Sequence, residues 1–391
     1  MAKQDVYLGR IESIGGHQLL SGWLSAKHPL RHMDLPLFTA ALATAALGCI
    51  AIYSATRPSL VALGRDPNFY LKRQLAFLAL AMVVFIISVL FDYRQLRGLS
   101  PLIYLAGIGL LVLVLSPIGH TTLGAQRWIT LGILQIQPSE IMKLVLIVAL
   151  SALWADKGAN TGLGRVVLAV ALAAIPAGLI YLQPDLGTVL VLVFLAFSIV
   201  VVAGARLRWI GLLVGLSVAV FVLVLHLGLL HDYQIKRLTA FLDQSSKSTA
   251  AYNLQQSRTA VASGGLTGKG LFRGTQTNLD YVPENHTDFI FTVVGEETGF
   301  AGSLLLIGLF SFLIWRALRI AMMSKDQFGA RLAAGVGAML AFQLFINVGM
   351  TIGIVPVVGI PLPFVSYGGS SLLTSFCAVG ILMNIHMRRF I

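Results

Sequence analysis

Charged side chains are scarce in this sequence. Asp, Glu, Lys and Arg make up 11% of the 391 residues, whereas hydrophobic residues make up 57%. The mean hydropathy is +0.84, and apolar runs of about 18 or more residues recur along the chain. A water-soluble fold has no means of hiding that much apolar surface, so the composition predicts a polytopic integral membrane protein.

Cysteine and acidic residues are also few. Cys49 and Cys377 both lie inside apolar segments, where they are expected as small hydrophobic residues, so neither indicates a disulfide or a metal site. The 28 basic residues outnumber the 16 acidic ones and give a net charge of +12. Because the basic residues are scattered between apolar runs, we expect anionic lipid headgroups as partners and no nucleic acid.

Several familiar motifs are absent. The sequence has no Walker loop, no Rossmann glycine pattern, no Cys/His metal spacing and no nucleophile elbow, so chemistry driven by ATP is not indicated. Residues 1–33 lack the compact apolar core of a cleavable signal peptide. We interpret 1–33 as a cytoplasmic N-terminal tail and 34–391 as one transmembrane domain.

The apolar segments predict an all-α fold of about ten transmembrane helices. They lie at 35–55, 73–91, 99–118, 139–154, 165–182, 186–204, 209–230, 288–318, 331–354 and 365–386. A polar loop at 231–287 separates the seventh segment from the eighth. Its length exceeds the usual connection in a bundle and marks it as functional or disordered, and its mixture of Gly and aromatic residues favours a functional loop.

The distribution of basic residues favours a cytoplasmic N-terminus. With that orientation, sixteen of the 28 basic residues are cytoplasmic: Lys3, Arg10, Lys27, Arg31, Arg94, Arg97, Lys157, Arg165, Arg206, Arg208, Arg316, Arg319, Lys325, Arg331, Arg388 and Arg389. The first outer loop, with Arg57, Arg65, Lys72 and Arg73, argues mildly against it. Every polar stretch that contains candidate functional residues then faces outward. These stretches are GAQRW at 124–128, QPSE at 137–140, QPDLG at 183–187, the 231–287 loop and PVVGIPLPFVSYGGSS at 356–371. This one-sidedness predicts a single site on the outer face.

Asp288 lies where the long polar loop enters the eighth apolar segment. A carboxylate at such a junction can face both water and a substrate held in the bilayer, so it is our candidate general base. The alternative is an ordinary acidic residue at a helix N-terminus, stabilised by the helix dipole. Glu296 and Glu297 follow deeper in the segment, where carboxylates are costly and usually paired.

Other polar residues outline a candidate binding site for an anionic substrate. Gln126 and Arg127 are both candidate substrate-binding residues. Arg127, which also neighbours Trp128, is either a clamp for phosphate oxygens or a headgroup anchor in an aromatic belt. Glu140 and Lys143 share a helix face, where they either neutralise each other or help to hold an anionic group.

Asp185 and Ser370 complete the candidate site. Asp185 follows Gln183 and Pro184, so its default role is to start a helix. Ser370 belongs to the run GGSS at 368–371, whose amides can cradle phosphate at a helix start. Close helix packing by small residues explains that run about as well.

Four long motifs carry a resemblance to a known family. They are GAQRWITLGILQIQPSEIMKL, QPDLGT, SGGLTGKGLFRGTQTNLDYVPENHTDFIFTVVGEETGFAG and NVGMTIGIVPVVGIPLPFVSYGGSSLL. In this order they resemble the SEDS family of peptidoglycan glycosyltransferases, from about residue 34 to the C-terminus. GTQT at 274–277, QPDLGT and PVVGIPLP are similar to the RodA-type elongation branch, with the division-type, FtsW-like branch as the alternative.

The resemblance implies a ten-helix SEDS fold that polymerises lipid II into glycan strands during cell elongation. It places the protein in the bacterial inner membrane with its site facing the periplasm. The family's essential aspartate falls on Asp288, and Arg127, Glu140, Lys143 and Asp185 fall in or beside the polar cavity. Implied partners are a class B penicillin-binding protein of the PBP2 type and the MreC and MreD scaffold. A divalent cation, Mg or Mn, is also implied, with its mode of binding open.

The expected mechanism needs one base and charge neutralisation. Asp288 takes the proton of an attacking sugar hydroxyl, and direct displacement inverts the anomeric centre. Because pyrophosphate is already a good leaving group, no second carboxylic acid is required, and Arg127 and Lys143 stabilise its charge. The competing hypotheses are a flippase for lipid-linked precursors and a scaffold that activates a transpeptidase.

Overall fold

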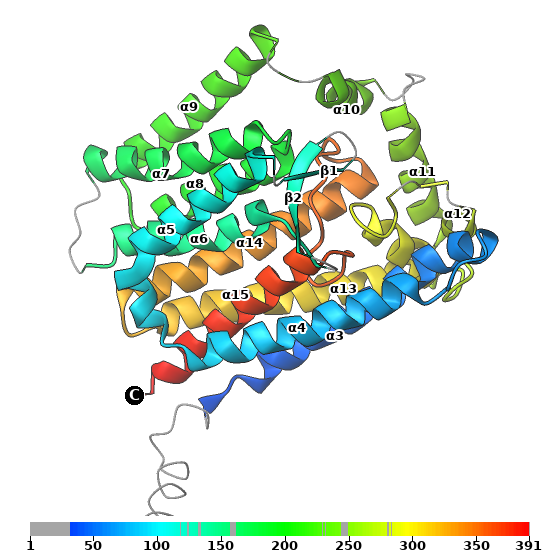
Figure 1. Cartoon of the computed structure of the whole chain (residues 1–391), viewed down its shortest axis with the longest axis horizontal. Helices are drawn as coiled ribbons and strands as arrows, with labels where there is room; N and C mark the ends of the chain where they lie inside the picture. The colour runs from blue at the N-terminus through cyan, green and yellow to red at the C-terminus, as the bar shows by residue number, and fades with distance from the viewer. Residues whose placement is uncertain are drawn as a thin grey trace, which may run out of the picture.

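The computed structural model describes residues 32–117, 119–122, 125–131, 134–156, 162–228, 230, 232–243, 249–279, 281–282 and 284–390. The expected N-terminal tail at 1–33 therefore lies almost wholly outside the described residues. Within them, long helices run side by side as a bundle (Figure 1). They are α3 (Leu35–Ala62), α4 (Phe69–Leu90), α5 (Tyr93–Leu115), α6 (Pro138–Leu153), α7 (Leu163–Tyr181), α8 (Leu186–Val202), α9 (Leu207–His226), α13 (Ile290–Met323), α14 (Gln327–Ile352) and α15 (Gly369–Arg388).

The polytopic membrane fold predicted from the sequence is confirmed. Among the described residues, eight of these helices are long and apolar enough to cross a membrane, and α8 is a shorter apolar helix. The remaining one, α6, is buried along nearly its whole length and packs against α5, α8 and α14, so it forms the centre of the bundle. By contrast, α9 buries only Leu213 and leans away from the other helices, which leaves its apolar surface for lipid (Figure 1).

Short polar side chains start several helices. Asp34 accepts a hydrogen bond from the Leu37 amide at the start of α3, and Asp326 accepts one from the Gly329 amide at the start of α14. Each carboxylate satisfies an amide that has no partner within its helix. The end of α14 is set by Gly353, which has φ of 80°, in the left-handed region that glycine adopts without steric cost.

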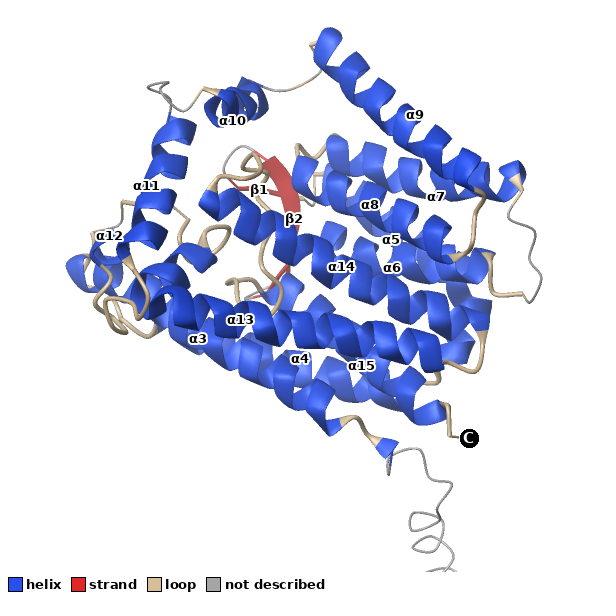
Figure 2. Cartoon of the chain, turned by 180° about the vertical axis from the view of Figure 1, so that it is seen from behind, coloured by secondary structure: helices blue, strands red, loops and turns tan. Residues whose placement is uncertain are grey.

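Two regions between the long helices contain structure that hydropathy did not predict. Residues 120–136 form a three-stranded antiparallel sheet in the order β1 (His120–Thr122), β2 (Ala125–Leu131) and β3 (Leu134–Ile136). The 231–287 loop contains α10 (Asp232–Leu242), α11 (Thr249–Ser263) and α12 (Thr275–Asn278). These three helices lie around the end of the bundle that is away from the C-terminus (Figure 2).

The eighth apolar segment is broken near its start. Gly299 has φ of 64° and ψ of −159°, which interrupts α13. In a continuous helix the Phe300 amide would donate to the Glu296 carbonyl. Instead, Lys269 N donates to the Glu296 carbonyl at 3.1 Å and Phe300 N donates to the Gly265 carbonyl at 2.9 Å. The glycine-rich segment 264–270 therefore lies against the break and satisfies the backbone groups that it exposes.

Candidate functional site

Asp288 lies in the turn that precedes α13, where its side chain is half-buried. The buried amide of Asn347, on α14, donates to the Asp288 carbonyl at 2.9 Å and to the Ile360 carbonyl at 2.8 Å. One side chain thus fixes the backbone of Asp288 against the loop that joins α14 to α15. The position of the candidate base is set by residues far from it in sequence.

The Asp288 carboxylate and the Arg237 guanidinium both lie beside Gly359. A Cβ atom built on Gly359 would lie 3.0 Å from Asp288 Oδ2 and 3.3 Å from Arg237 Nη1. Gly359 also has φ of 72°, so glycine is favoured both by its backbone and by the lack of space. Arg237 comes from α10 and is half-buried, with its guanidinium 5.7 Å from the ring centroid of Tyr233.

The charges around Asp288 form one cluster. The pKa of Asp288 is raised to about 6, chiefly by burial. Arg237 and Arg127 lower this pKa, whereas Glu284 and Asp185 raise it. The carboxylate is therefore ionised at neutral pH, yet basic enough to accept a proton near pH 7. Two other residues predicted from the sequence, Asp185 and Arg127, are thus close enough to Asp288 to affect its pKa.

Arg127 lies on β2 and holds the turn between α7 and α8. Its Nε donates to the Gln183 carbonyl at 2.8 Å, and its Nη2 donates to the Pro184 carbonyl. Two of the five N–H donors of the guanidinium therefore bind backbone. The proposed contact between Arg127 and substrate phosphate stays a prediction.

Asp185 has the helix-start role that the sequence indicated. Its carboxylate accepts from Thr188 N at 3.2 Å and from Thr188 Oγ1 at 2.9 Å, which caps α8. It also accepts from Gln137 Nε2 at 3.3 Å and so joins the start of α8 to the start of α6. A contact between Asp185 and substrate stays a prediction.

Glu140 and Lys143 form a buried ion pair on α6. The Lys143 Nζ to Glu140 Oε1 distance is 2.7 Å, and the two side chains are 2% and 3% exposed. The two charges neutralise each other, which is one of the two alternatives that the sequence left open. Removing one partner would strand a charge in the bundle, at a cost of about 3–5 kcal/mol, so loss of activity in such a variant would not identify a ligand.

Gln126 and Ser370 hold loops in place. Gln126 Nε2 donates to the carbonyls of Ser116, at 2.7 Å, and Gly119, at 3.0 Å. The Ser370 hydroxyl accepts from Gln137 N at 2.9 Å and donates to the Gln135 carbonyl at 3.2 Å, so it ties the start of α15 to β3 and α6. Their roles in substrate binding stay predictions.

Glu296 forms an ion pair with Lys269, as its depth in the segment suggested, and Glu297 has a hydroxyl partner. The fully buried Glu296 accepts from Lys269 Nζ at 2.8 Å, Gln276 N at 2.8 Å and Thr277 N at 2.9 Å. It therefore anchors the GTQT motif at α12. Glu297 accepts from the Ser54 hydroxyl of α3.

Sequence reasoning missed Arg237 and Asn347. Arg237 is one of six basic residues in the 231–287 loop, and only the folding of α10 distinguishes it from the others. Asn347 lies within the motif that begins NVGM, and a buried asparagine in an apolar helix was the available signal.

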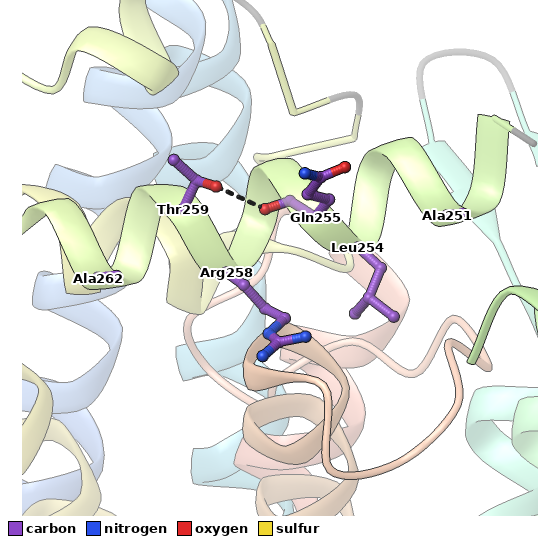
Figure 3. Close-up of a pocket in the computed structure, with 6 residues that line it drawn as sticks. All are labelled: Ala251, Leu254, Gln255, Arg258, Thr259 and Ala262. Carbon is purple, nitrogen blue, oxygen red and sulfur yellow. Dashed lines mark hydrogen bonds between the residues drawn. The ribbon is translucent and has the colours of Figure 1, made fainter. Parts of the chain in front are cut away.

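A groove of about 420 Å³ runs along α11, apart from the Asp288 cluster. It is lined by Ala251, Leu254, Gln255, Arg258, Thr259 and Ala262 (Figure 3). The Arg258 side chain points from α11 toward the end of α14, where its Cδ is 3.0 Å from a Cβ built on Gly353. None of the residues that surround the Asp288 carboxylate lines this groove.

Known proteins match nearly the whole chain. The profile of the family described as "Cell cycle protein", which covers FtsW, RodA and SpoVE, matches residues 34–390. Peptidoglycan glycosyltransferase MrdB of Escherichia coli strain K12 is 38% identical over 92% of this chain and 94% of its own length. Stage V sporulation protein E of Bacillus subtilis strain 168 is 38% identical over 90% of this chain and 96% of its own.

Solved structures show the same fold. A chain in the structure described as "Structural coordination of polymerization and crosslinking by a peptidoglycan synthase complex" has a TM-score of 0.76, 32% identity, and coverage of 92% of this chain and 98% of that one. The rod shape determining protein RodA of Thermus thermophilus has a TM-score of 0.68, 32% identity, and coverage of 92% and 98%. The chain belongs to the FtsW, RodA and SpoVE family, which is the SEDS family that its motifs resemble.

Proposed function

We propose that this chain is a peptidoglycan glycosyltransferase that polymerises lipid II into glycan strands during cell elongation. The observation that supports it most directly is a half-buried carboxylate, Asp288, held beside Arg237 where a polar loop enters the bundle. The relative MrdB is named as a peptidoglycan glycosyltransferase, which supports the reaction class. Asp288 would face the outer leaflet of the bacterial inner membrane, where the lipid-linked donor and acceptor present their sugars.

The proposed step has a simple proton and electron balance. An acceptor sugar hydroxyl attacks the anomeric carbon of the donor, and the bond from that carbon to the pyrophosphate oxygen breaks. Asp288 takes the hydroxyl proton, and the electron pair leaves with the lipid pyrophosphate. Arg127 and Arg237 lie close enough to Asp288 to influence its charge, so they are positioned to stabilise the departing pyrophosphate. Lys143 is already paired with Glu140 and is the weaker candidate for this role.

Divalent cations and protein partners are part of the proposal. Among the described residues, no group of three or more His, Cys, Asp or Glu side chains could hold a metal ion. The proposed Mg or Mn ion would therefore be held largely by the substrate pyrophosphate, as Mg²⁺ commonly is, and no step above uses it. We propose a PBP2-type class B penicillin-binding protein as the crosslinking partner, because one structural neighbour is a chain of a peptidoglycan synthase complex. MreC and MreD are proposed as scaffold partners on the family resemblance alone.

The test uses purified protein, labelled lipid II and a gel that resolves glycan polymers. We expect the wild-type protein to form polymer and Asp288→Asn to lose about 10²–10⁴-fold in rate, the range that a positioned base contributes. The matched control is Asp66→Asn, an exposed acid in the loop between α3 and α4 that pairs with Lys72, which should keep its activity. Polymer formation by Asp288→Asn at the wild-type rate would remove Asp288 as the base. Movement of lipid II across vesicles without polymer would favour the flippase.

A further inference from the structure

Three arginines converge at the far end of α13 from Asp288. Arg316 and Arg319 lie on the last two turns of α13, and Arg389 follows the end of α15. The guanidinium carbons of Arg316 and Arg319 are 5.7 and 5.2 Å from the ring centroid of Trp315. Burial lowers the pKa of Arg389, and Arg316 and Arg319 lower it further, as expected for like charges at short range.

Among the residues that the structure describes, little negative charge lies beside this cluster. Asp34 is the acid that contacts it; the carboxylate is fully buried, pairs with Arg316 and also caps α3. Arg389 Nη1 donates to Met323 Sδ, a weak acceptor, at 2.8 Å. In the part of the chain that the structure describes, the buried Nε atoms of Arg316 and Arg389 have no hydrogen-bond partner. Buried donors of this kind are costly unless an acceptor binds them.

Apolar side chains frame the cluster on the outside of the bundle. Trp315, Met322 and Phe390 are 49%, 78% and 50% exposed. Cations beside exposed tryptophan, phenylalanine and methionine suit a ligand that has an anionic headgroup and hydrocarbon chains. A free phosphate ion would use the arginines and leave the apolar surface uncovered.

We propose that Arg316, Arg319 and Arg389 bind the phosphate of an anionic phospholipid in the leaflet opposite the catalytic face. Phosphate oxygens accept from guanidinium forks in two-point contacts and would satisfy the unpaired Nε donors. The acyl chains would lie on Trp315 and Met322. This site is independent of glycosyl transfer, so neither proposal depends on the other.

The same end of the bundle has ordinary interfacial arginines for comparison. Arg97 pairs with Asp156 at 2.6 Å, and Arg388 pairs with Asp92 at 3.0 Å. Arg208, at the start of α9, lies 4.5 Å from the ring of Trp209. Arg208 lies beside a tryptophan, as Arg319 does, but it is not part of the cluster of three arginines. It is therefore the matched control.

The experiment measures lipid binding to the purified full chain in a neutral detergent by native mass spectrometry. The probes are phosphatidylglycerol and phosphatidylcholine with the same acyl chains. One arginine near a membrane surface contributes about a fivefold change in affinity for anionic lipid. We therefore expect Arg319→Gln to weaken phosphatidylglycerol binding about fivefold and Arg319→Gln with Arg389→Gln to weaken it about tenfold or more. Both variants keep the buried pair of Arg316 with Asp34, so the fold should be retained.

The control separates a built site from general attraction to a basic protein. Arg208→Gln removes the same charge outside the converging cluster, where the guanidinium would not contact the bound phosphate and salt screens its charge. It should therefore change phosphatidylglycerol binding less than about twofold. Equal losses in Arg208→Gln and Arg319→Gln, or equal binding of the two lipids by the wild-type chain, would overturn the proposal. Complete displacement of phosphatidylglycerol by millimolar inorganic phosphate would also overturn it, because the site would then bind a free anion.

Discussion

The properties of the Asp288 carboxylate depend on residues from several parts of the chain. Arg237 reaches it from α10, Asn347 fixes its backbone from α14, and Gly359 leaves space in the loop before α15. Burial alone would raise the pKa of this carboxyl, and the nearby arginines limit the rise to about 6. A base with that pKa is ionised at pH 7 and still accepts a proton readily.

Gly359→Ala tests this arrangement. The new methyl group would lie 3.0 Å from Asp288 Oδ2 and 3.3 Å from Arg237 Nη1, so the carboxylate or the guanidinium must move. We expect polymerisation to fall at least about tenfold, because small displacements of a catalytic group are costly. Rates from labelled lipid II provide the measurement.

Gly64→Ala is the control for the backbone effect of that substitution. Gly64 has φ of 65° and open space where its Cβ would lie, so it carries the same left-handed strain, about 1 kcal/mol, without the contact. Activity should be retained in Gly64→Ala. Equal activity of the Gly359 and Gly64 variants would show that crowding at Gly359 does not affect the base.

Local sequence patterns predicted the roles of those polar residues whose partners are close in the chain. Asp185 follows Gln-Pro at a helix start, and Glu140 lies one turn before Lys143, so local spacing was enough. Arg237 and Asn347 reach Asp288 only through tertiary folding, which one sequence does not encode in any short pattern. Gln126 was predicted as a ligand, and its amide nitrogen binds two loop carbonyls.

Among the elements, the break in α13 depends on the segment 264–270. Its glycines permit close backbone approach: a Cβ on Gly268 would lie 2.1 Å from the Glu297 carbonyl oxygen, and Gly268 has φ of 79°. Because Asp288 lies in the turn just before this short helical stretch, displacement of the segment should disturb the site as well as the fold.

Gly268→Ala should lower the thermal unfolding temperature of the purified protein and reduce polymerisation. Gly265→Ala is the matched control, since Gly265 has φ of 57° and open space around its Cβ position. Both variants carry the same left-handed backbone strain. Only in Gly268→Ala does the new methyl group push the 264–270 segment away from α13. Indistinguishable unfolding temperatures for the two variants would contradict a close-packed insertion.

Hydropathy predicted the spans well and the connecting elements poorly. A span is an average over about 20 residues, so single polar residues do not obscure it. The strand β3 has three residues and α12 has four, and each is held by partners distant in sequence, such as Glu296 for α12. The prediction of one apolar segment at 288–318 gave no sign of the break. The non-helical backbone at Gly299 is stabilised by hydrogen bonds to the 264–270 segment, which is distant in sequence.

Across the whole molecule, the two ends of the bundle carry different charge arrangements. The Asp288 end mixes acids and arginines around a base. At the other end Arg316, Arg319 and Arg389 lie together, and among the described residues Asp34 is their acidic neighbour. The order of the motifs predicted that the polar, potentially catalytic residues lie at one end of the bundle. Asp288, Asp185 and Arg127 do lie at the same end. The arginine cluster was not predicted, because its members were counted only as evidence for orientation.

The pH dependence of the whole enzyme follows from the direction of the Asp288 shift. Its pKa in the folded protein, about 6, lies above the ordinary value of 3.8, so ionisation is less favourable in the fold. The charge therefore costs stability above about pH 6, and that cost is lost below about pH 4. Asp288→Asn should leave the unfolding temperature at neutral pH unchanged or slightly raised, which separates lost catalysis from lost folding.

The rate of polymer formation between about pH 5 and pH 8, in wild-type protein and in Asp288→Asn, tests the central claim most directly. If Asp288 is the base, the wild-type rate is level above pH 6 and falls about tenfold per pH unit below it. The rate of Asp288→Asn is low and does not change across this range. A variant that polymerises lipid II at the wild-type rate, or that shows the same titration near pH 6, would contradict the role of Asp288 as the base.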